Sequence, residues 1–471
     1  MADMARLRCP WRVGALSIGF SVAIIFFVLV EMHMFVTQQK YANRASFAVE
    51  SEEGCQRELR KLGDKILTQQ TTLFELKKFD GFWFVICNIV VMSGVDEKAR
   101  LEEDNRVLGT ELEDFQNKEQ LAKISGSSKL GPVAAVVIMA CNRPDYLERT
   151  LKSVTKYHKD VAEKFPLFVS QDGSNQDVMD TARSFSSVNF LQHLDENPPK
   201  TRNPGEIIAY YKIASHYKWA LTQLFNKRDF RRVVILGDDM EISPDFFSYF
   251  EATAPLLDTD KTLLAISSWN DNGQEKFVSD PEQLYRSDFF PGLGWMLTKS
   301  TWEELAPKWP NAYWDDWLRL KENRKGRQVI RPEVCRTYNF GEQGSSLGQF
   351  YEQYLKSIKL NNVNVDWRSK DLNYLKKGQF NPIFNSLVSK AAIIPASQAL
   401  TEANYGEGDI RVQYYSLVEF KYLAHEFGIF EDTKDGIPRT AYNGVIVFRW
   451  KGQKRVFLTD FFQQLDTIET L

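Results

Sequence analysis

One stretch of this 471-residue chain, residues 231–247 (RRVVILGDDMEISPDFF), limits what the chain can fold into more than any other. Residues 233–236 form a short apolar run of mostly β-branched side chains, typical of a strand buried on both faces, and the run stops at Gly237, Asp238 and Asp239. Ligands of open α/β sheets bind outside the carboxyl ends of the strands. Two adjacent carboxylates at such an end therefore indicate a divalent cation bound together with a phosphorylated ligand.

A less specific interpretation of the same acids is a polar turn that leads into a helix. Ser243, followed by Pro244 and Asp245, has the composition of an N-cap and a first helical turn. Taken alone, an acidic pair in this setting caps a helix more often than it binds a metal. The choice depends on whether other strands end in similar residues.

Two other stretches do end in polar residues. Residues 132–141 (PVAAVVIMAC) lead into Arg143, and residues 166–172 (PLFVSQD) end at Asp172. A helical pattern follows the first of these strands, and an amphipathic helix at residues 210–225 leads into the strand before Asp238. This alternation predicts a doubly wound sheet. Three strands with polar residues at one edge favour a nucleotide site over unrelated turns.

Composition narrows the class of protein further. The chain is 43% hydrophobic, and its 59 Lys and Arg residues against 62 Asp and Glu residues leave no basic excess for binding nucleic acid. Its five cysteines form no CxxC pair, which argues against a structural zinc site or a disulfide framework. A large enzyme with appended segments fits these values.

The N-terminal region predicts a membrane anchor. Residues 13–30 are uncharged and apolar, long enough for one spanning helix that extends loosely to residue 35. Arg6, Arg8 and Arg12 precede it, so the positive-inside rule keeps the N-terminus in the cytosol and places the remainder in the lumen. A cleaved signal peptide is the competing interpretation, but no small-residue cleavage site follows.

The region between the anchor and the first strand predicts a helical stem. Leu59, Ile66 and Leu73 recur every seven residues, which is the spacing of a coiled coil and allows a homo-oligomer through the stem. Residues 81–94 (GFWFVICNIVVMSG) interrupt this pattern and are too short for a second span. If they are exposed, they need a partner, a membrane surface or burial on a neighbour.

Eight blocks of the sequence closely resemble the N-acetylglucosaminyltransferase I family, and the likeness runs from about residue 131 to about residue 458. The blocks are ACNR at 140–143, VSQD at 169–172, YYKIASHYKWAL at 210–221, DDMEISPDFF at 238–247, SWNDNGQ at 268–274, LYRSDFFPGLGWML at 284–297, PKWPNAYWDDWLRL at 307–320 and RKGRQVIRPEVCRT at 324–337. Long collinear blocks are far more specific than a single motif.

The resemblance implies a metal-dependent, inverting glycosyltransferase with a single Rossmann-like nucleotide-sugar-binding domain of the GT-A type and a smaller C-terminal α+β domain. It implies Mn2+ as the cofactor and UDP-N-acetylglucosamine as the donor. It also implies roles for seven residues: Asp239 as metal ligand, Arg143, Asp172, His216, Asp238 and Ser346 as donor contacts, and Asp315 as catalytic base.

The residue patterns and the family resemblance together divide the chain into its expected parts. The expected parts are a cytosolic tail (1–12), a transmembrane signal anchor (13–35), a helical stem (36–128), a nucleotide-sugar-binding catalytic domain (129–341), a lid loop and linker (342–375) and a C-terminal α+β domain (376–471). The resemblance implies a single-pass type II protein of the Golgi membrane with a lumenal catalytic domain.

The resemblance also implies the reaction, with one departure. The expected activity adds N-acetylglucosamine to the 2-hydroxyl of the α1,3-linked mannose of an oligomannose N-glycan. A relative that acts on O-linked mannose is an alternative. The family pattern has a glutamate where this chain has Gly237. A catalytically weakened, membrane-anchored sugar-binding subunit is therefore a third interpretation.

Overall fold

The computed structural model describes residues 131–461, apart from residues 196–198, 346–347, 402–407 and 452–453. Within these residues, no helix has the length and apolar character needed to cross a membrane. The predicted anchor and stem lie outside the described residues, as does Ser346.

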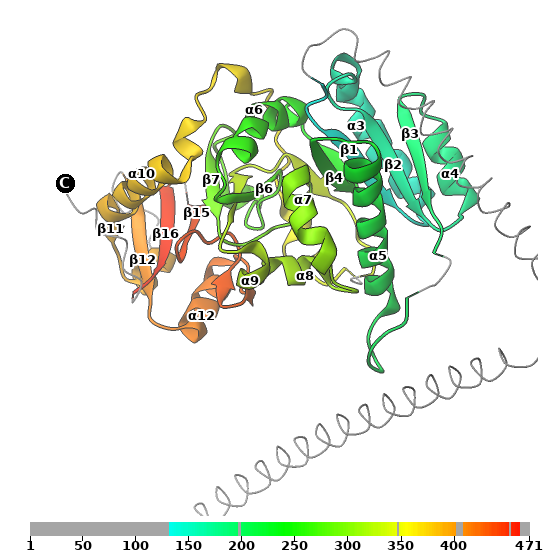
Figure 1. The fold of residues 1–471 in the computed structure, drawn as a ribbon. Coiled ribbons are helices and arrows are strands. Elements are labelled where there is room, and N and C mark those ends of the chain that lie inside the picture. Colours follow the sequence, from blue (N-terminus) through cyan, green and yellow to red (C-terminus); the bar gives the residue numbers. More distant parts are fainter. Residues whose placement is uncertain (1–130, 196–198, 346–347, 402–407, 452–453, 462–471) are drawn as a thin grey trace, which may run out of the picture. The chain divides into compact units, whose positions relative to one another are not determined.

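A sheet of eight strands forms the centre of the fold (Figure 1). Its order is β3-β2-β1-β4-β8-β6-β9-β7. Strands β3, β2, β1 and β4 are parallel, whereas β8 runs antiparallel to both β4 and β6. The strands are β1 (Ala135–Ala140), β2 (Leu167–Asp172), β3 (Val188–His193), β4 (Arg232–Gly237), β6 (Leu263–Ser267), β7 (Leu284–Ser287), β8 (Trp295–Thr298) and β9 (Gln328–Pro332).

Helices cover both faces of this sheet because β1 is apolar on both sides. Val136 and Ile138 lie in one core cluster with α3 (Pro144–His158), α4 (Gln176–Arg183) and α6 (Phe246–Thr259). The intervening Val137 lies in a second cluster on the opposite face. The helices of that face are α5 (Ile208–Thr222), α7 (Lys299–Leu305) and α8 (Trp314–Arg319), and the short α9 (Lys321–Arg324) follows α8.

The chain therefore changes direction between β1 and β4. From β1 it proceeds through α3 to β2 and then through α4 to β3, and it returns through α5 on the other face to β4, beside β1. Such a switch point opens a crevice at the carboxyl ends of the two strands. This arrangement confirms the predicted doubly wound core, and the antiparallel strands β8 and β7 make the sheet a mixed one.

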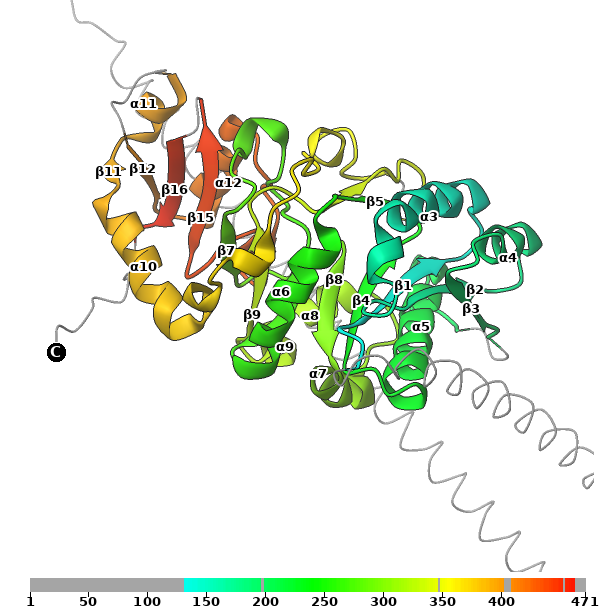
Figure 2. The same cartoon turned by 90° about the horizontal axis from the view of Figure 1, so that it is seen from above.

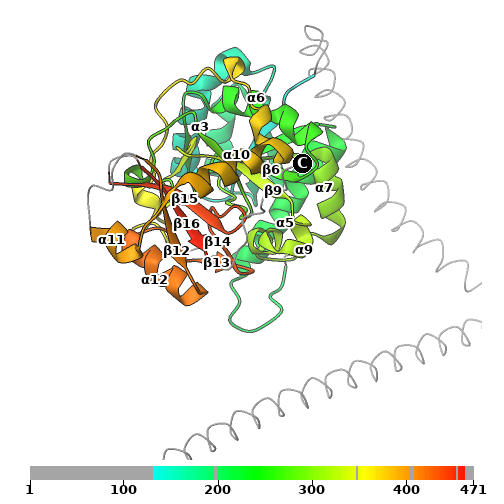
Figure 3. The ribbon, with the colours of Figure 1, turned by 90° about the vertical axis from the view of Figure 1, so that its left-hand side faces the viewer.

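A second sheet follows toward the C-terminus, at the end of the fold opposite β3 (Figure 2). Its order is β11-β12-β16-β15, and Figure 3 shows α10 and α12 beside it. The elements are α10 (Lys377–Lys390), β11 (Ala392–Ile393), α11 (Ala396–Thr401), β12 (Ile410–Tyr414), α12 (Leu417–Phe427), β13 (Thr433–Lys434), β14 (Ile437–Pro438), β15 (Val445–Trp450) and β16 (Lys454–Asp460). Val447 and Phe457 join the main core, so the two sheets share packing. The domain boundary at residue 376 stays a prediction.

The segment after the acidic pair does not begin a helix at once. Residues Met240–Ile242 form β5, which pairs with β10 (Thr337–Asn339) as a separate two-stranded sheet. Helix α6 begins only at Phe246. Ser243 is therefore not its N-cap, and its hydroxyl donates to Asp245 Oδ1 at 2.7 Å instead.

Asp245 connects distant segments inside the core. Its carboxylate and the Arg336 guanidinium are both 0% exposed and form an ion pair of 3.0 Å. Asn361 Nδ2 and Trp367 Nε1 also donate to it, each at 2.8 Å. A buried charge is tolerated only when it is paired and hydrogen-bonded. Asp245 therefore fixes β10 and the segment around Trp367 onto α6.

We expect Asp245→Ala to destabilise the protein by about 3–5 kcal/mol, because it leaves the Arg336 charge buried without its partner. Urea unfolding measures this change. Glu352, whose carboxylate forms an exposed i,i+4 pair with Lys356, supplies a control, since Glu352→Ala should change the unfolding free energy little. Equal effects of the two substitutions would contradict the role assigned to Asp245.

Candidate active site

The predicted acidic pair lies at the switch point, together with Arg143. Asp238 and Asp239 follow β4, and Arg143 immediately precedes α3, after the end of β1. The strands are in parallel register, with Met139 opposite Gly237. Arg143 Nη2 forms an ion pair with Asp238 Oδ1 and another, of 3.0 Å, with Asp239 Oδ2. The structure thus brings three of the predicted residues into direct contact.

Asp238 is the more deeply placed of the two acids. Its side chain is 5% exposed, and burial raises its pKa to about 6, with a further increase from Asp239 and an opposing decrease from Arg143. The backbone of Asp238 is also fixed, because Thr150 Oγ1 of α3 donates to its carbonyl at 2.8 Å. Two adjacent carboxylates in this setting need positive charge, which Arg143 supplies.

Asp239 is held from a second direction by the end of β10. Asn339 Nδ2 donates to Asp239 Oδ1 at 3.0 Å, and Phe340 N donates to its carbonyl at the same distance. Gly341 lies so close that a Cβ there would collide with Asp239 Oδ2. Arg143 Nη1 also donates to the Gln343 carbonyl at 2.7 Å. The chain after β10 thus wraps the acidic pair.

Asp172 and His216, two further predicted nucleotide contacts, lie in a second cluster at the carboxyl end of β2. Asp172 Oδ1 lies 2.7 Å from Nδ1 of His193, the last residue of β3. The His193 ring stacks on that of His216 with centroids 5.6 Å apart and planes 8° apart. His216 Nε2 in turn hydrogen-bonds Ser170 Oγ at 2.8 Å. Burial lowers the pKa of His216 to about 4, so this imidazole is neutral at pH 7.

Cys141 connects this cluster to the acidic pair. The cysteine follows β1 and is exposed. Burial of its sulfur raises the pKa of the thiol, and the negative charges of Asp172 and Asp238 raise it further. Strand β1 is the parallel neighbour of both β2 and β4, with Ala140 opposite Gln171 and Met139 opposite Gly237, so Asp172 and Asp238 lie at strand ends at the same edge of the sheet.

Asp315 lies on the short helix α8, on the α5 side of the sheet. Arg319, one turn later, binds its Oδ2 at 2.8 Å, and the Asp315 side chain is 40% exposed. Residue Tyr313 before it has a φ of +52° and stacks on Tyr210 of α5 with centroids 4.7 Å apart. Burial raises the pKa of Tyr217, and Asp239, Asp315 and Asp238 raise it further. Tyr217 of α5 stacks on Trp314, the residue directly before Asp315, with ring centroids 4.5 Å apart.

Neighbouring Asp316 is engaged elsewhere. Its carboxylate binds Arg319 at 3.0 Å and Lys434 at 2.7 Å, and these cations lower its pKa despite its partial burial. A carboxylate held by two cations is a weaker proton acceptor than one held by a single arginine. Asp316 thus has two cationic partners, whereas the ion pair of Asp315 is with Arg319.

Comparisons with known proteins identify the family. The GNT-I family model matches residues 21–467, which is most of the chain. The chain is also 53% identical over 455 residues to an alpha-1,3-mannosyl-glycoprotein 2-beta-N-acetylglucosaminyltransferase from Arabidopsis thaliana, covering 97% of each chain.

The chain belongs to the GNT-I family.

Solved structures give weaker likenesses. A mannosyltransferase from Pyrobaculum calidifontis, in complex with GDP-Man and Mn2+, shares 15% identity at a TM-score of 0.31, covering 52% of this chain and 70% of that one. The galactosyltransferase LgtC, in complex with donor and acceptor sugar analogues, shares 17% identity at a TM-score of 0.26, covering 42% and 72%. These likenesses are too distant to add to the family assignment.

The acidic pair of this GNT-I family member suits a cation only if other groups complete the set of oxygen ligands. Among the described residues, no group of three or more His, Cys, Asp or Glu side chains is placed to hold a metal ion. Divalent cations can bind through one or two carboxylates when substrate phosphates and water supply the other oxygens. Asp238 and Asp239 fit that kind of site. A cation bound at Asp239 Oδ2 would take the position where Arg143 now contacts this oxygen.

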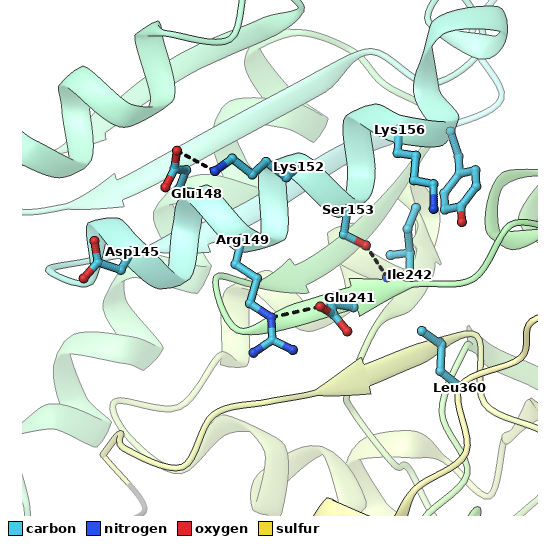
Figure 4. Close-up of a pocket in the computed structure, with 10 residues that line it drawn as sticks. Asp145, Glu148, Arg149, Lys152, Ser153, Lys156, Glu241, Ile242 and Leu360 are labelled. Atoms are coloured by element: carbon cyan, nitrogen blue, oxygen red, sulfur yellow. Dashed lines mark hydrogen bonds and ion pairs between the residues drawn. The ribbon is translucent and has the colours of Figure 1, made fainter.

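A separate cavity lies on the outer side of α3 (Figure 4). It has a volume of about 530 Å3, and its walls include Arg149, Lys152 and Lys156 of α3 and Glu241 of β5. Arg149 pairs with Glu241 at 2.8 Å, and Lys152 pairs with Glu148 at the same distance. None of the predicted site residues lines this cavity, so it is distinct from the crevice at the acidic pair.

Sequence reasoning missed three residues that this site uses. Asn339 and His193 lie outside the family blocks and come from β10 and β3, and Tyr217 lies within a block but was assigned no role. Tyr217 could have been suspected, since it lies one residue after His216 in a helix that the family blocks include. Ser346 lies outside the described residues, and its role stays a prediction.

His216 should make the fold sensitive to acid. Its pKa is about 4 in the folded protein and about 6.5 in the unfolded chain, so below pH 6.5 the unfolded chain takes up a proton that the folded protein does not. Stability therefore falls as the pH drops through this window, by about 2–3 kcal/mol near pH 4.5. We expect His216→Gln to remove this part of the pH dependence, as measured by urea unfolding at pH 7 and pH 4.5.

Exposed His425 supplies the control. Its hydrogen bond to Glu431 raises the pKa of its imidazole, so His425→Gln should not reduce the loss of stability in acid. An unchanged pH dependence in His216→Gln would mean that His216 is protonated in the folded protein.

Proposed function

We propose that this GNT-I family member transfers N-acetylglucosamine from UDP-N-acetylglucosamine to the 2-hydroxyl of the α1,3-linked mannose of an oligomannose N-glycan. One observation carries the proposal: the chain is 53% identical, over 97% of its length, to a relative named alpha-1,3-mannosyl-glycoprotein 2-beta-N-acetylglucosaminyltransferase. The order of the sheet supports it, because Arg143, Asp172 and Asp238 follow or adjoin the carboxyl ends of neighbouring parallel strands. An N-terminal signal anchor at residues 13–35 would hold the catalytic part in the Golgi lumen.

The donor would lie across the crevice between the two clusters. Asp172 would accept from the uracil N–H, and Asp238 would contact the nucleoside. Arg143, whose planar fork suits phosphate oxygens, would turn from Asp239 toward the diphosphate. Mn2+, bound at Asp239, would supply the positive charge that stabilises the departing diphosphate. Asn339 would keep Asp239 oriented toward it.

Asp315 would act as the base. In an inverting transfer, the mannose 2-hydroxyl oxygen forms a bond to C1 of the sugar while the bond from C1 to the phosphate oxygen breaks. UDP departs with the electron pair, and the hydroxyl proton passes to Asp315. The contact with Arg319 uses Oδ2 and fixes the carboxylate. Tyr313 and Tyr210 flank this position with aromatic faces suited to a sugar.

The test is a transfer assay with the full-length chain, UDP-N-acetylglucosamine and a five-mannose N-glycan, with and without a chelator. We expect transfer that requires a divalent cation, and a loss of at least 10²-fold in turnover for Asp239→Ala, because the diphosphate would leave with its charge uncompensated. Glu241→Ala, two residues further along the chain, is a control expected to keep turnover. Binding of UDP without any transfer would instead support a sugar-binding subunit, and undiminished transfer in chelator would refute the metal assignment.

Asp315→Asn tests whether Asp315, and not its neighbour Asp316 on α8, acts as the base. The amide keeps the shape of the side chain but cannot accept the hydroxyl proton, so UDP affinity should be retained while turnover falls by about 10²-fold or more. Calorimetry with UDP and turnover measurements provide the two values. Asp316→Asn should retain more of the turnover, since Asp316 is held by Arg319 and Lys434. A parallel loss of affinity and turnover in Asp315→Asn would show a binding role.

A further inference from the structure

We propose that His193 is a positioning residue that makes the donor site selective for uracil, by holding Asp172 in the orientation that accepts the N–H of this base. The inference rests on the proposed function, since it concerns the nucleotide end of the same site. Neither the sequence motifs nor the family blocks include His193. His193 lies at the end of β3, directly opposite Asp172 in the parallel register of β2 and β3.

The chemistry of the contact fixes which group donates. His193 Nδ1 and Asp172 Oδ1 are 2.7 Å apart, and the two side chains are 8% and 15% exposed. An ionised carboxylate has no proton to give, so the Nδ1–H of the imidazole donates. A charge-assisted hydrogen bond of this length restrains the short aspartate side chain. Asp172 Oδ1 is thereby committed to His193, and the second oxygen is the one available to a ligand.

The His193 ring is itself held in place. It stacks on His216 and lies 5.1 Å from the Trp219 ring, centroid to centroid. His216 is anchored by Ser170 Oγ and is neutral at pH 7, because burial lowers the pKa of its imidazole. Ser170 and Asp172 belong to the same strand. The series of side-chain contacts from Ser170 through His216 and His193 to Asp172 therefore begins and ends on β2. It fixes the Asp172 carboxylate.

A fixed carboxylate discriminates between pyrimidines. Uracil presents an N–H at ring position 3, which an Asp172 oxygen can accept, whereas cytosine presents a lone pair at that position and would face the negative charge. Sites built around one hydrogen bond reject analogues that leave it unpaired. Uracil and cytosine are distinguished only if the Asp172 carboxylate cannot rotate away and let a water molecule bind in its place. His193 supplies this restraint, and Asp172 and Asp238 lie at the ends of strands that flank β1 in parallel register, at the same edge of the sheet.

The experiment compares UDP and CDP affinity by calorimetry on the full-length chain with a divalent cation present. His193→Gln keeps an N–H donor, and His193→Met has nearly the same length without one. We expect the preference for UDP over CDP to fall about tenfold in His193→Met and to be largely retained in His193→Gln. KM for UDP-N-acetylglucosamine should rise in His193→Met with little change in kcat, because Asp315 and the acidic pair are untouched.

Two further variants complete the design. His193→Phe keeps the stack on His216 without the donor, and should lose the preference like His193→Met; thermal unfolding shows which donor-free variants are folded. His158→Phe is the matched control, since this buried histidine hydrogen-bonds the Phe165 carbonyl at 2.7 Å and packs against Phe247. It should leave the UDP preference unchanged.

The outcomes distinguish the inference from the function that it rests on. An undiminished preference for UDP in a folded donor-free variant, or an equal loss in His193→Gln and His193→Met, would overturn the role of His193 alone. A wild-type chain that binds UDP no better than CDP would overturn the donor assignment itself.

Discussion

The whole site depends on how two adjacent carboxylates are kept at the end of a buried strand. Asp238 is nearly enclosed, and its neighbour Asp239 adds a second negative charge, so the pair needs a cation from another element. Arg143 provides it across 95 residues of sequence. This contact is possible because β1 and β4 are parallel neighbours that end together. The charge of the two acids can therefore be compensated only if the sheet places β1 beside β4.

The same requirement explains why an arginine is suited to this position. Its Nη2 contacts both acids, while Nε also donates to Asp238 and Nη1 donates to the Gln343 carbonyl, a spread of donors that a lysine ammonium lacks. In a site that takes up a cation and a diphosphate, the acids exchange one positive charge for another, and the arginine gains a phosphate partner. The low dielectric that makes the unpaired acids costly also strengthens their interaction with an incoming cation.

The sequence predicted those strands whose apolar residue pattern agrees with their buried position in the folded sheet. Strands β1, β2 and β4 are apolar on both faces, and each ends near a polar group, so their position and shared edge could be inferred. Strand β3 alternates between buried and partly exposed residues at the edge of the sheet, and its apolar pattern is weak. His193 was missed for that reason. Asn339 was missed because its link to Asp239 joins residues 100 positions apart, which no local pattern reports.

Asp245 shows the opposite failure, in which a local rule was outweighed by tertiary structure. The Ser-Pro-Asp sequence is typical of a helix start, but the carboxylate binds the buried Arg336 and draws Ser243 into the same network. An interior charge of this kind has more to gain from full pairing than a helix has from one cap. The helix accordingly begins later, at Phe246, and Ser243 lies between β5 (Met240–Ile242) and the start of this helix.

Gly237 is best understood through the same geometry. A Cβ at this position would lie 2.8 Å from Asp239 Oδ1, the oxygen that Asn339 binds, so any side chain there would require Asp239 to turn. A glutamate would also add a third carboxylate beside two that share Arg143. Like charges about 4 Å apart repel by about 4 kcal/mol at an effective dielectric constant of about 20. A hydrogen bond from a sugar hydroxyl to that glutamate would contribute about 1.5–3 kcal/mol. The two effects are comparable, so under the proposed function the glycine would give up a sugar contact, relieve repulsion and keep Asp239 on Asn339. The donor sugar would then be positioned by the other walls of the crevice.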